Sequence, residues 1–183
     1  TRAGSYGDVP DFSAVLLTQK YPDHFHEPTL ERLQPNVVLA PRSIARRVAR
    51  VLPNAALYLF DSDSRTHMVD AITVTQLPTR RRIDPIYDAF LLSDGQQSVL
   101  MANHGLDVDE QHRVQLAGLG PVDLLLSPFN RYTLPRFLGG VVTPGVEGLR
   151  QLVEQTRPRA VVQTHDEPKH GSGLVPALAR IER

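Results

Sequence analysis

The sequence predicts an α/β fold, and three of its features support this prediction. Short apolar runs typical of buried strands alternate with segments whose apolar residues recur at helical spacing. The chain has 183 residues, of which 41% are apolar, enough to bury a sizeable core. Several predicted strands end in polar side chains, where α/β proteins usually place their chemistry. We therefore expect a single domain over residues 1–183.

The first third of the chain alternates strands and helices. Pro28 stands in the first turn of one predicted helix, and Pro41 begins the next. The arginines of that second helix (Arg42, Arg46, Arg47 and Arg50) are expected to form its solvated face. The expected elements are a strand at 14–17, a helix at 27–33, a strand at 36–40, a helix at 41–52 and a strand at 56–60.

The rest of the chain continues this pattern with one long exception. Polar and apolar residues alternate over 67–76, which predicts a half-exposed strand, and Asp94-Gly95 predicts a hairpin turn. The proline-rich segment 128–145 is expected to be an irregular loop of functional importance. The other expected elements are strands at 88–93, 98–102, 122–127 and 160–164, and helices at 108–117, 146–156 and 174–181.

The polar segment after the first strand carries a recognisable motif. Thr18 is followed by Gln19, Tyr21, Asp23 and His24. This order resembles the H-x-H-x-D-H motif of the metallo-β-lactamase superfamily, with Gln19 and Tyr21 in place of its first two histidines. The resemblance implies an αββα sandwich. Because a complete sandwich has several strands before this motif, we expect N-terminal strands to be missing, with a first sheet that is built differently as the alternative.

The histidines at other strand ends extend the candidate site. His104 and His165 each follow a predicted strand, so both are expected at the same sheet edge as Asp23 and His24. The resemblance implies the same set, with Asp23 and His24 on the second metal, His104 at the bridging position and His165 as the final ligand. His26 is a possible extra ligand.

The resemblance also implies that the first metal site is lost. Its two motif histidines are replaced, and no histidine stands near Thr79, where its third ligand would be expected. We therefore expect one divalent metal, with zinc favoured and iron or manganese as alternatives. Such a metal lowers the pKa of a bound water toward about 7, which provides a hydroxide nucleophile. Asp23, as a ligand of this metal, is the candidate catalytic residue.

These residues predict a metal-dependent hydrolase of an ester, lactone or phosphoester. Gln19 and Tyr21 are candidates for hydrogen bonding to substrate, although they are also explained as drift after loss of the first metal. Arg80 and Arg82 could clamp an anionic small molecule, or they are simply solvated. The alternative function is a non-catalytic module that binds a ligand or protein in the old cleft. The sequence contains no G-x-S-x-G, P-loop or G-x-G-x-x-G motif.

The amino-acid composition limits the possible metal ligands and the classes of binding partner. The chain has no cysteine, so disulfides and thiolate metal ligands are excluded, and a cytoplasmic location is expected. Its formal net charge is zero, which argues against binding to nucleic acid or membranes and favours small-molecule substrates. His67, His112 and His170 are expected on the surface. Segment 61–64 is expected to be a turn.

Overall fold

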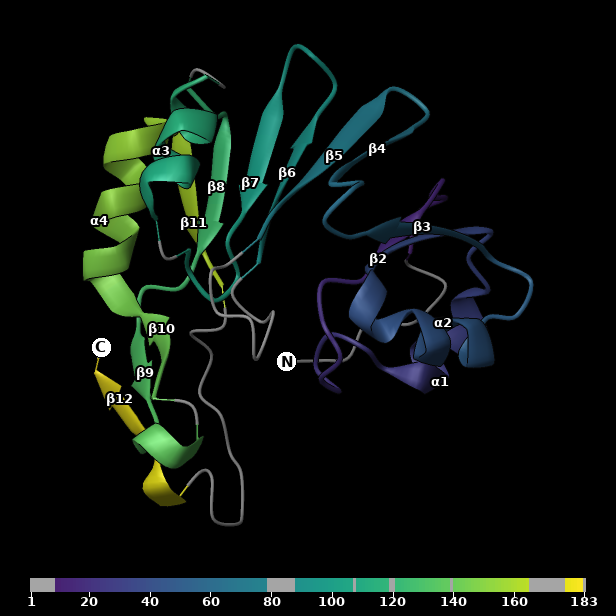
Figure 1. The fold of residues 1–183 in the computed structure, drawn as a ribbon, viewed down its shortest axis with the longest axis horizontal. Helices are drawn as coiled ribbons and strands as arrows, with labels where there is room; N and C mark the ends of the chain where they lie inside the picture. The colour runs from purple at the N-terminus through teal and green to yellow at the C-terminus, as the bar shows by residue number, and fades with distance from the viewer. Residues whose placement is uncertain are drawn as a thin grey trace. The chain divides into compact units, whose positions relative to one another are not determined.

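The computed structural model describes residues 9–78, 88–106, 108–118, 121–138, 140–164 and 177–182 (Figure 1). The chain forms two compact units, Thr1–Thr73 and Val74–Arg183, whose boundary falls within strand β5 (Ile72–Leu77). No helix among the described residues is long and apolar enough to span a lipid bilayer.

The first unit is built on a parallel sheet with the order β1-β2-β3. Val38 and Ala40 of β2 point to one face, where they pack with Leu30 of α1, Ile44 of η2 and Val48 of α2. This packing confirms the strand–helix alternation predicted for the unit. Its elements are β1 (Val15–Leu16), α1 (Glu27–Leu33), β2 (Val37–Pro41), η2 (Arg42–Ile44), α2 (Ala45–Val51), β3 (Ala56–Phe60) and β4 (Thr66–Val69).

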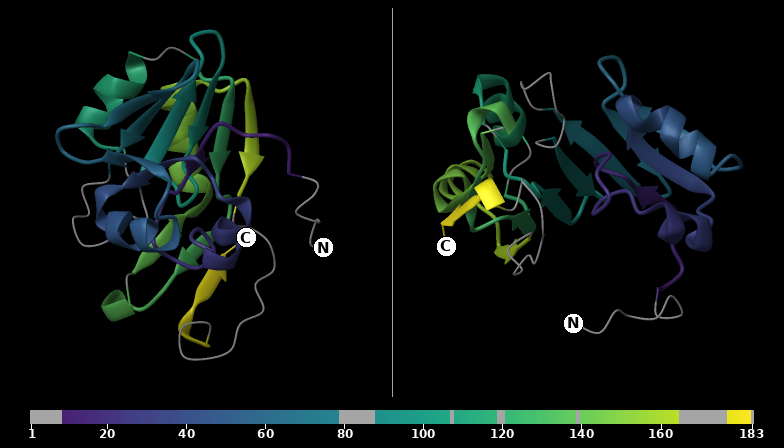
Figure 2. Two further views of the ribbon diagram at one scale, coloured as in Figure 1. Left: turned by 90° about the vertical axis from the view of Figure 1, so that its right-hand side faces the viewer. Right: turned by 90° about the horizontal axis from the view of Figure 1, so that it is seen from below.

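The second unit contains most of a sheet with the order β11-β8-β7-β6-β5-β4. Strands β7, β8 and β11 run parallel, and β6 is antiparallel to β7. Leu116 of α3 and Leu152 of α4 are buried against Leu100 and Leu125 of this sheet, and Figure 2 shows both helices beside it. Its elements are β5 (Ile72–Leu77), β6 (Ala89–Ser93), β7 (Ser98–Met101), α3 (Glu110–Ala117), β8 (Leu124–Ser127), α4 (Gly145–Thr156) and β11 (Ala160–Gln163).

The predicted hairpin at Asp94-Gly95 is confirmed. β6 and β7 pair in the register Ser93–Ser98, and Asp94 Oδ1 accepts hydrogen bonds from the backbone N–H groups of Gln96 and Gln97. Gly95 adopts a φ of +88°, a conformation that glycine reaches at little steric cost. Local turn chemistry therefore determines this connection.

Three of the predicted elements are wrong in whole or in part. Segment 67–76 is not one strand: it turns at Asp70, whose φ is +52°, to form the β4–β5 hairpin. The segment predicted as an irregular loop contains β9 (Arg131–Thr133), η4 (Arg136–Leu138) and β10 (Val141–Pro144). In the helix predicted at 174–181, residues 177 and 178 are helical, but Arg180–Glu182 form strand β12, which pairs with β9. The small sheet β10-β9-β12 is stabilised by Thr143, whose hydroxyl bonds the backbone of Asn130 and Tyr132.

Candidate metal-binding site

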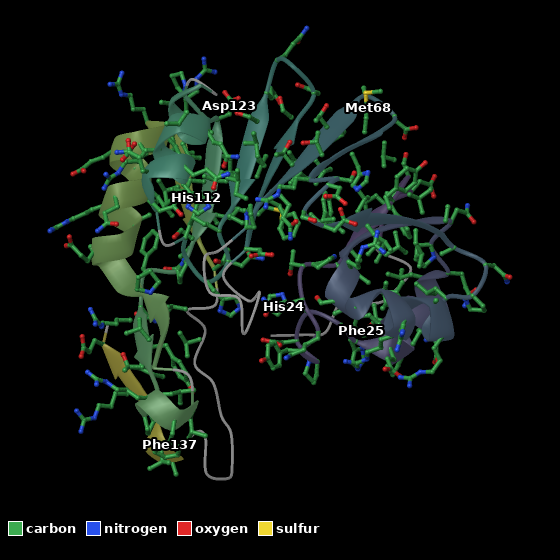
Figure 3. The ribbon with its side chains drawn as sticks, viewed as in Figure 1. His24, Phe25, Met68, His112, Asp123 and Phe137 are labelled. Atoms are coloured by element: carbon green, nitrogen blue, oxygen red, sulfur yellow. The ribbon has the colours of Figure 1, made fainter. Side chains whose placement is uncertain are left out.

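The motif residues Asp23 and His24 lie in a single helical turn between β1 and α1. Tyr21 C=O accepts hydrogen bonds from the N–H groups of His24 and Phe25, at 2.9 and 2.7 Å. The Phe25 side chain is 1% exposed and packs in the core of the first unit (Figure 3). The turn is therefore closed by backbone bonds and anchored at its end by a buried ring.

Two side-chain donor atoms lie close together in this turn. His24 Nε2 is 3.7 Å from Asp23 Oδ2, and Thr18 Oγ1 is 3.2 Å from His24 Nδ1. The His24 side chain is 9% exposed, whereas that of Asp23 is 55% exposed. Two ligands on one zinc ion, each at about 2.0–2.2 Å, stand roughly 3.4 Å apart in tetrahedral geometry. The spacing and chemistry of these donors therefore fit a shared divalent metal.

Gln19 and Tyr21 occupy the two positions where the motif has histidine. The Gln19 side chain is buried, and its Oε1 has no hydrogen-bond partner among the described residues. Tyr21 is partly exposed, and the Lys20 ammonium lies 5.1 Å from its ring centroid. Gln19 therefore presents a buried acceptor, which is a costly arrangement unless a donor reaches it.

The possible extra ligand, His26, stands at the N-terminal boundary of α1. Its Nδ1 lies 2.7 Å from Thr29 Oγ1, and both residues are at the start of that helix. This bond occupies one of the two ring nitrogens. The role of His26 as a metal ligand stays a prediction.

His104 lies in a sharp turn just after β7. Ala102 N–H donates to Leu126 C=O, which extends the β7–β8 ladder, and Gly105 N–H then donates back to Ala102 C=O. Gly105 has a φ of +79°, and a Cβ placed there would lie 2.6 Å from the Pro144 ring. Glycine is thus required beside His104 by both conformation and space.

The carboxyl ends of three parallel strands meet at this edge of the second unit. β8 ends at Ser127, which is buried, and Ser127 C=O accepts a hydrogen bond from Thr164 N–H at the end of β11. The strands preceding His104 and His165 therefore end at one edge of one sheet, as expected. The strand preceding Asp23 and His24, β1, belongs to the separate β1-β2-β3 sheet, so the expectation of a single sheet edge for all four residues is wrong. His165 itself follows Thr164 directly and lies outside the described residues.

The predicted ligands are thus distributed over the chain. Asp23 and His24 lie together in the first unit, and His104 lies in the second unit. No cluster of three or more His, Asp or Glu side chains suited to a metal occurs within the described ranges. Arg80 and Arg82 fall in the undescribed segment 79–87. The complete ligand set remains a prediction.

Arg47 contacts the motif loop (residues 20–27), and these contacts were not predicted from the sequence. Its Nε donates to Glu27 Oε1 at 2.8 Å, and its Nη1 donates to the Lys20 carbonyl at 2.7 Å. Its Cζ also lies 4.3 Å from the centroid of the Phe25 ring. The expectation of a wholly solvated arginine face on α2 is therefore wrong for Arg47. No local pattern signals these contacts, because Glu27 is 20 residues away.

Two predictions about histidines outside the motif are also wrong. His112 is 2% exposed: its Nδ1 accepts from Asp109 N–H in a capping box, and its Nε2 donates to Pro78 C=O (Figure 3). His67 is half-buried, with Nε2 donating to Leu59 C=O and its ring packed edge-on against aromatic side chains. Both have structural roles that depend on distant partners. The third, His170, lies outside the described residues.

Two carboxylates of the first unit have shifted pKa values. The pKa of Glu27 is lowered from its ordinary value of 4.5, mainly because Arg47 donates a hydrogen bond to it. The pKa of Asp61 is lowered by the hydrogen bond from Arg42 and then by backbone bonds from Ser64 and Asp63. Those backbone bonds confirm the predicted turn at 61–64.

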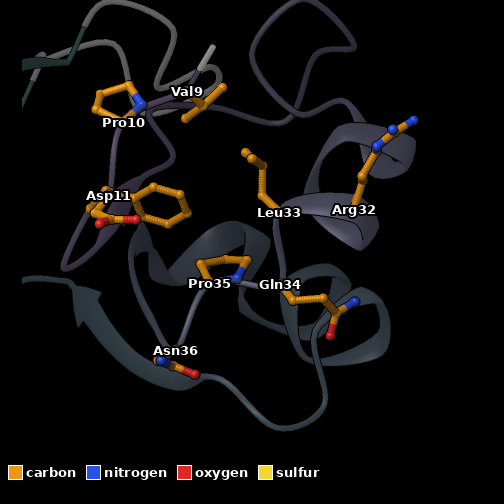
Figure 4. Close-up of a pocket in the computed structure, with 9 residues that line it drawn as sticks. Val9, Pro10, Asp11, Arg32, Leu33, Gln34, Pro35 and Asn36 are labelled. Atoms are coloured by element: carbon orange, nitrogen blue, oxygen red, sulfur yellow. The ribbon is translucent and has the colours of Figure 1, made fainter. Parts of the chain in front are cut away.

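An open pocket of about 510 Å³ lies elsewhere in the first unit (Figure 4). It is formed where the segment before β1 passes the C-terminal end of α1. None of its lining residues is a predicted site residue. They are Val9, Pro10, Asp11, Phe12, Arg32, Leu33, Gln34, Pro35 and Asn36.

Comparison with solved structures identifies the fold. CmlA, a diiron β-hydroxylase from Streptomyces venezuelae, is 20% identical with a TM-score of 0.72, over 88% of this chain and 37% of its own. YhfI from Bacillus subtilis, a metallo-β-lactamase fold protein, is 15% identical with a TM-score of 0.63, over 87% and 68% of the two chains. The chain has the metallo-β-lactamase fold. This confirms the fold predicted from the motif.

One further solved structure has a similar fold, whereas the sequence comparisons found no match. An isothiocyanate hydrolase from Delia radicum gut bacteria is 15% identical with a TM-score of 0.61, over 87% of this chain and 68% of its own. No protein-family model matches the sequence, and no curated protein matches it. At these identities the structural likeness concerns the metallo-β-lactamase fold alone. The chain spans 37% of the length of CmlA.

Proposed function

We propose that the chain is a metal-dependent hydrolase of an ester, lactone or phosphoester. The proposed ligands of its single divalent metal, zinc being favoured, are Asp23, His24, His104 and His165. The observation that carries the proposal is the 3.7 Å separation of Asp23 Oδ2 and His24 Nε2 in the turn after β1. The fold supports it, because one structure of this fold is an isothiocyanate hydrolase.

The side chains of His24 and Asp23 in the first unit are suited to binding a divalent metal. With a proton on Nδ1 donated to Thr18, the lone pair of the His24 ring is on Nε2, the nitrogen that lies 3.7 Å from Asp23 Oδ2. The partly exposed Asp23 carboxylate supplies an anionic oxygen, the other donor type that zinc accepts. A divalent metal held there would lower the pKa of a coordinated water to about 7 and so supply a nucleophile at neutral pH.

Polar residues around the motif are proposed to bind substrate. An amide oxygen buried without a partner costs about 1–3 kcal/mol, so a donor on the substrate or a water would be favoured at Gln19 Oε1. The partly exposed Tyr21 can donate or accept a hydrogen bond through its phenol. Arg80 and Arg82 remain proposed as a clamp for an anionic small molecule.

A non-catalytic binding module is the second candidate function. The observation that favours it is the replacement of both motif histidines, by a buried Gln19 and a partly exposed Tyr21. In this case the region around the motif residues would bind a ligand or a protein without a metal.

Elemental analysis distinguishes the two candidates. We would purify the untagged protein without chelators, together with His24→Ala, His165→Ala and, as a control, Glu31→Gln on the exposed face of α1. About one equivalent of zinc, iron or manganese is expected in the wild type and in the control, and close to none in the histidine variants. Absence of metal from the wild type, even after reconstitution, would contradict the hydrolase proposal and support the binding module.

Activity is the second measurement. Chromogenic esters, lactones and phosphoesters would be screened with the metal-loaded wild type. The same two histidine variants should lose turnover while retaining the circular dichroism spectrum of the wild type. If either variant keeps full turnover, the proposed ligand set is wrong.

A further inference from the structure

Arg47 of α2 contacts the motif loop at three points that flank the donor pair. Its Nη1 donates to the carbonyl of Lys20, three residues before Asp23. Its Nε donates to the carboxylate of Glu27, three residues after His24. Its Cζ is 4.3 Å from the ring centroid of Phe25, directly after His24. One side chain thus holds both ends of the segment 20–27.

These contacts require the shape of a guanidinium group. A planar fork can direct two N–H groups to two different acceptors while its face or edge stays against an aromatic ring. A lysine ammonium is a point charge and cannot satisfy this arrangement in the same way. Arg47 is also only 35% exposed, whereas the preceding Arg46 is an exposed residue of the same helix. The two arginines therefore form a matched pair for mutation.

The segment held by Arg47 needs external support. The candidate metal ligands Asp23 and His24 lie in one turn, which is closed by two hydrogen bonds to Tyr21 C=O. A single helical turn is unstable in isolation. Asp23 is more than half exposed, so burial contributes little to its position. The buried Phe25 ring and the two hydrogen bonds of Arg47 supply the missing constraints.

We propose that Arg47 is a positioning residue for the candidate metal site. By holding Lys20, Phe25 and Glu27, it orders the turn so that Asp23 and His24 converge before a metal binds. The expected consequence of this ordering is tighter metal binding, and that part of the inference rests on the proposed function. Its structural part, the ordering of the turn, does not depend on any metal.

The first test is a cobalt(II) titration of the full chain followed by visible absorption. Arg47→Ala is expected to weaken Co²⁺ binding about tenfold, the lower end of what loss of an outer-sphere partner causes. Arg47→Lys should restore only a small part of that loss, and Arg46→Ala should bind like the wild type. Equal affinity in the wild type and Arg47→Ala would overturn the proposal.

Amide hydrogen exchange is the second test, and it requires no metal. In Arg47→Ala, exchange at the His24 and Phe25 amides should accelerate about tenfold relative to the wild type, as expected for a local opening. Exchange at the central β2 residues 38–40 should change much less. A uniform acceleration in both regions would indicate a general loss of stability and would overturn a positioning role.

The two tests separate failure of this inference from failure of the proposed function. If the wild type binds no Co²⁺, the metal-site proposal fails, and the exchange pattern alone decides whether Arg47 orders the turn. If Arg47→Ala does not fold, Glu27→Ala replaces it, because this variant removes the acceptor of Arg47 Nε and leaves the bond to the Lys20 carbonyl. An exchange pattern in Glu27→Ala identical to that of the wild type would then contradict the proposal.

Discussion

Thr18 Oγ1 lies 3.2 Å from Nδ1 of His24, so the residue that ends the first apolar run contacts the ring of the motif histidine six positions later. The contact fixes the rotation of the imidazole and leaves Nε2 on the side of Asp23 Oδ2. Hydrogen bonds of this kind to a ligand histidine hold its tautomer and orientation. Thr18 therefore has a testable role beside that of the predicted ligands.

Thr18→Val should weaken metal binding about tenfold with little loss of stability. Valine keeps the β-branched shape of threonine but removes the hydroxyl that contacts His24. Thr18→Ser, which retains a hydroxyl, is the control and should bind nearly as tightly as the wild type. Competition between the protein and a zinc indicator would measure the affinities. Equal affinity of Thr18→Val and wild type, beside a loss in His24→Ala, would exclude this role for Thr18.

Glu27 should make stability depend on pH in the acidic range. The hydrogen bond from Arg47 lowers the pKa of this carboxylate from 4.5, so its ionised form is favoured in the folded state. The stabilisation is therefore complete above pH 4.5 and is lost as the pH falls through the lower pKa of the folded state. Urea unfolding of wild type and Glu27→Gln should show a difference at pH 6 that shrinks toward pH 3. A difference that stays constant over this range would contradict the assignment.

Gly105→Ala should destabilise the second unit more than Gly95→Ala does. Both glycines have positive φ, but a Cβ at Gly105 would meet the Pro144 ring at 2.6 Å, whereas a Cβ at Gly95 meets nothing within 4 Å. We expect about 1 kcal/mol for backbone strain alone at Gly95 and about 2–4 kcal/mol at Gly105, where overpacking is added. Thermal or urea unfolding would measure both. Equal losses would show that the contact with Pro144 relaxes without cost.

His112→Ala should be strongly destabilising although His112 is no candidate ligand. The change removes the Nδ1 acceptor of Asp109 N–H and the Nε2 donor to Pro78 C=O in a buried environment, which together are worth about 2–4 kcal/mol. The bond from the backbone N–H of residue 112 to Asp109 Oδ1 stays. His26→Ala, at an exposed position, should cost less than about 1 kcal/mol. Chemical denaturation would compare the two free energies of unfolding. Equal and small losses would mean that His112 contributes little to the cap.

Much of the fold was predictable because its signals are local. Strands β2 and β3 and the helices between β1 and β3 follow from apolar periodicity and from proline at the helix starts. The Asp94-Gly95 turn follows from two adjacent residues whose side chain and backbone close it. The order Asp23-His24 after a strand was likewise enough to predict the metallo-β-lactamase fold that the solved structures support.

The errors concern elements that depend on distant pairing. Segments 131–133 and 141–144 are short and proline-rich at their borders, and they become strands only by pairing with each other and, for the first, with β12. The β4–β5 turn has Asp70 in the left-handed conformation, where glycine or asparagine would have been the usual signal. Short strands carry too little periodicity to be distinguished from loops.

The sequence by itself determined which side chains are available for metal chemistry and in what order they follow the strands, since residue identity and local periodicity are written in the chain. Only the tertiary structure decided which partners hold them. Arg47 reaches Glu27 across 20 residues, and His112 reaches Pro78 across 34. Such contacts depend on how helices pack against the rest of the fold, and no local spacing encodes that packing.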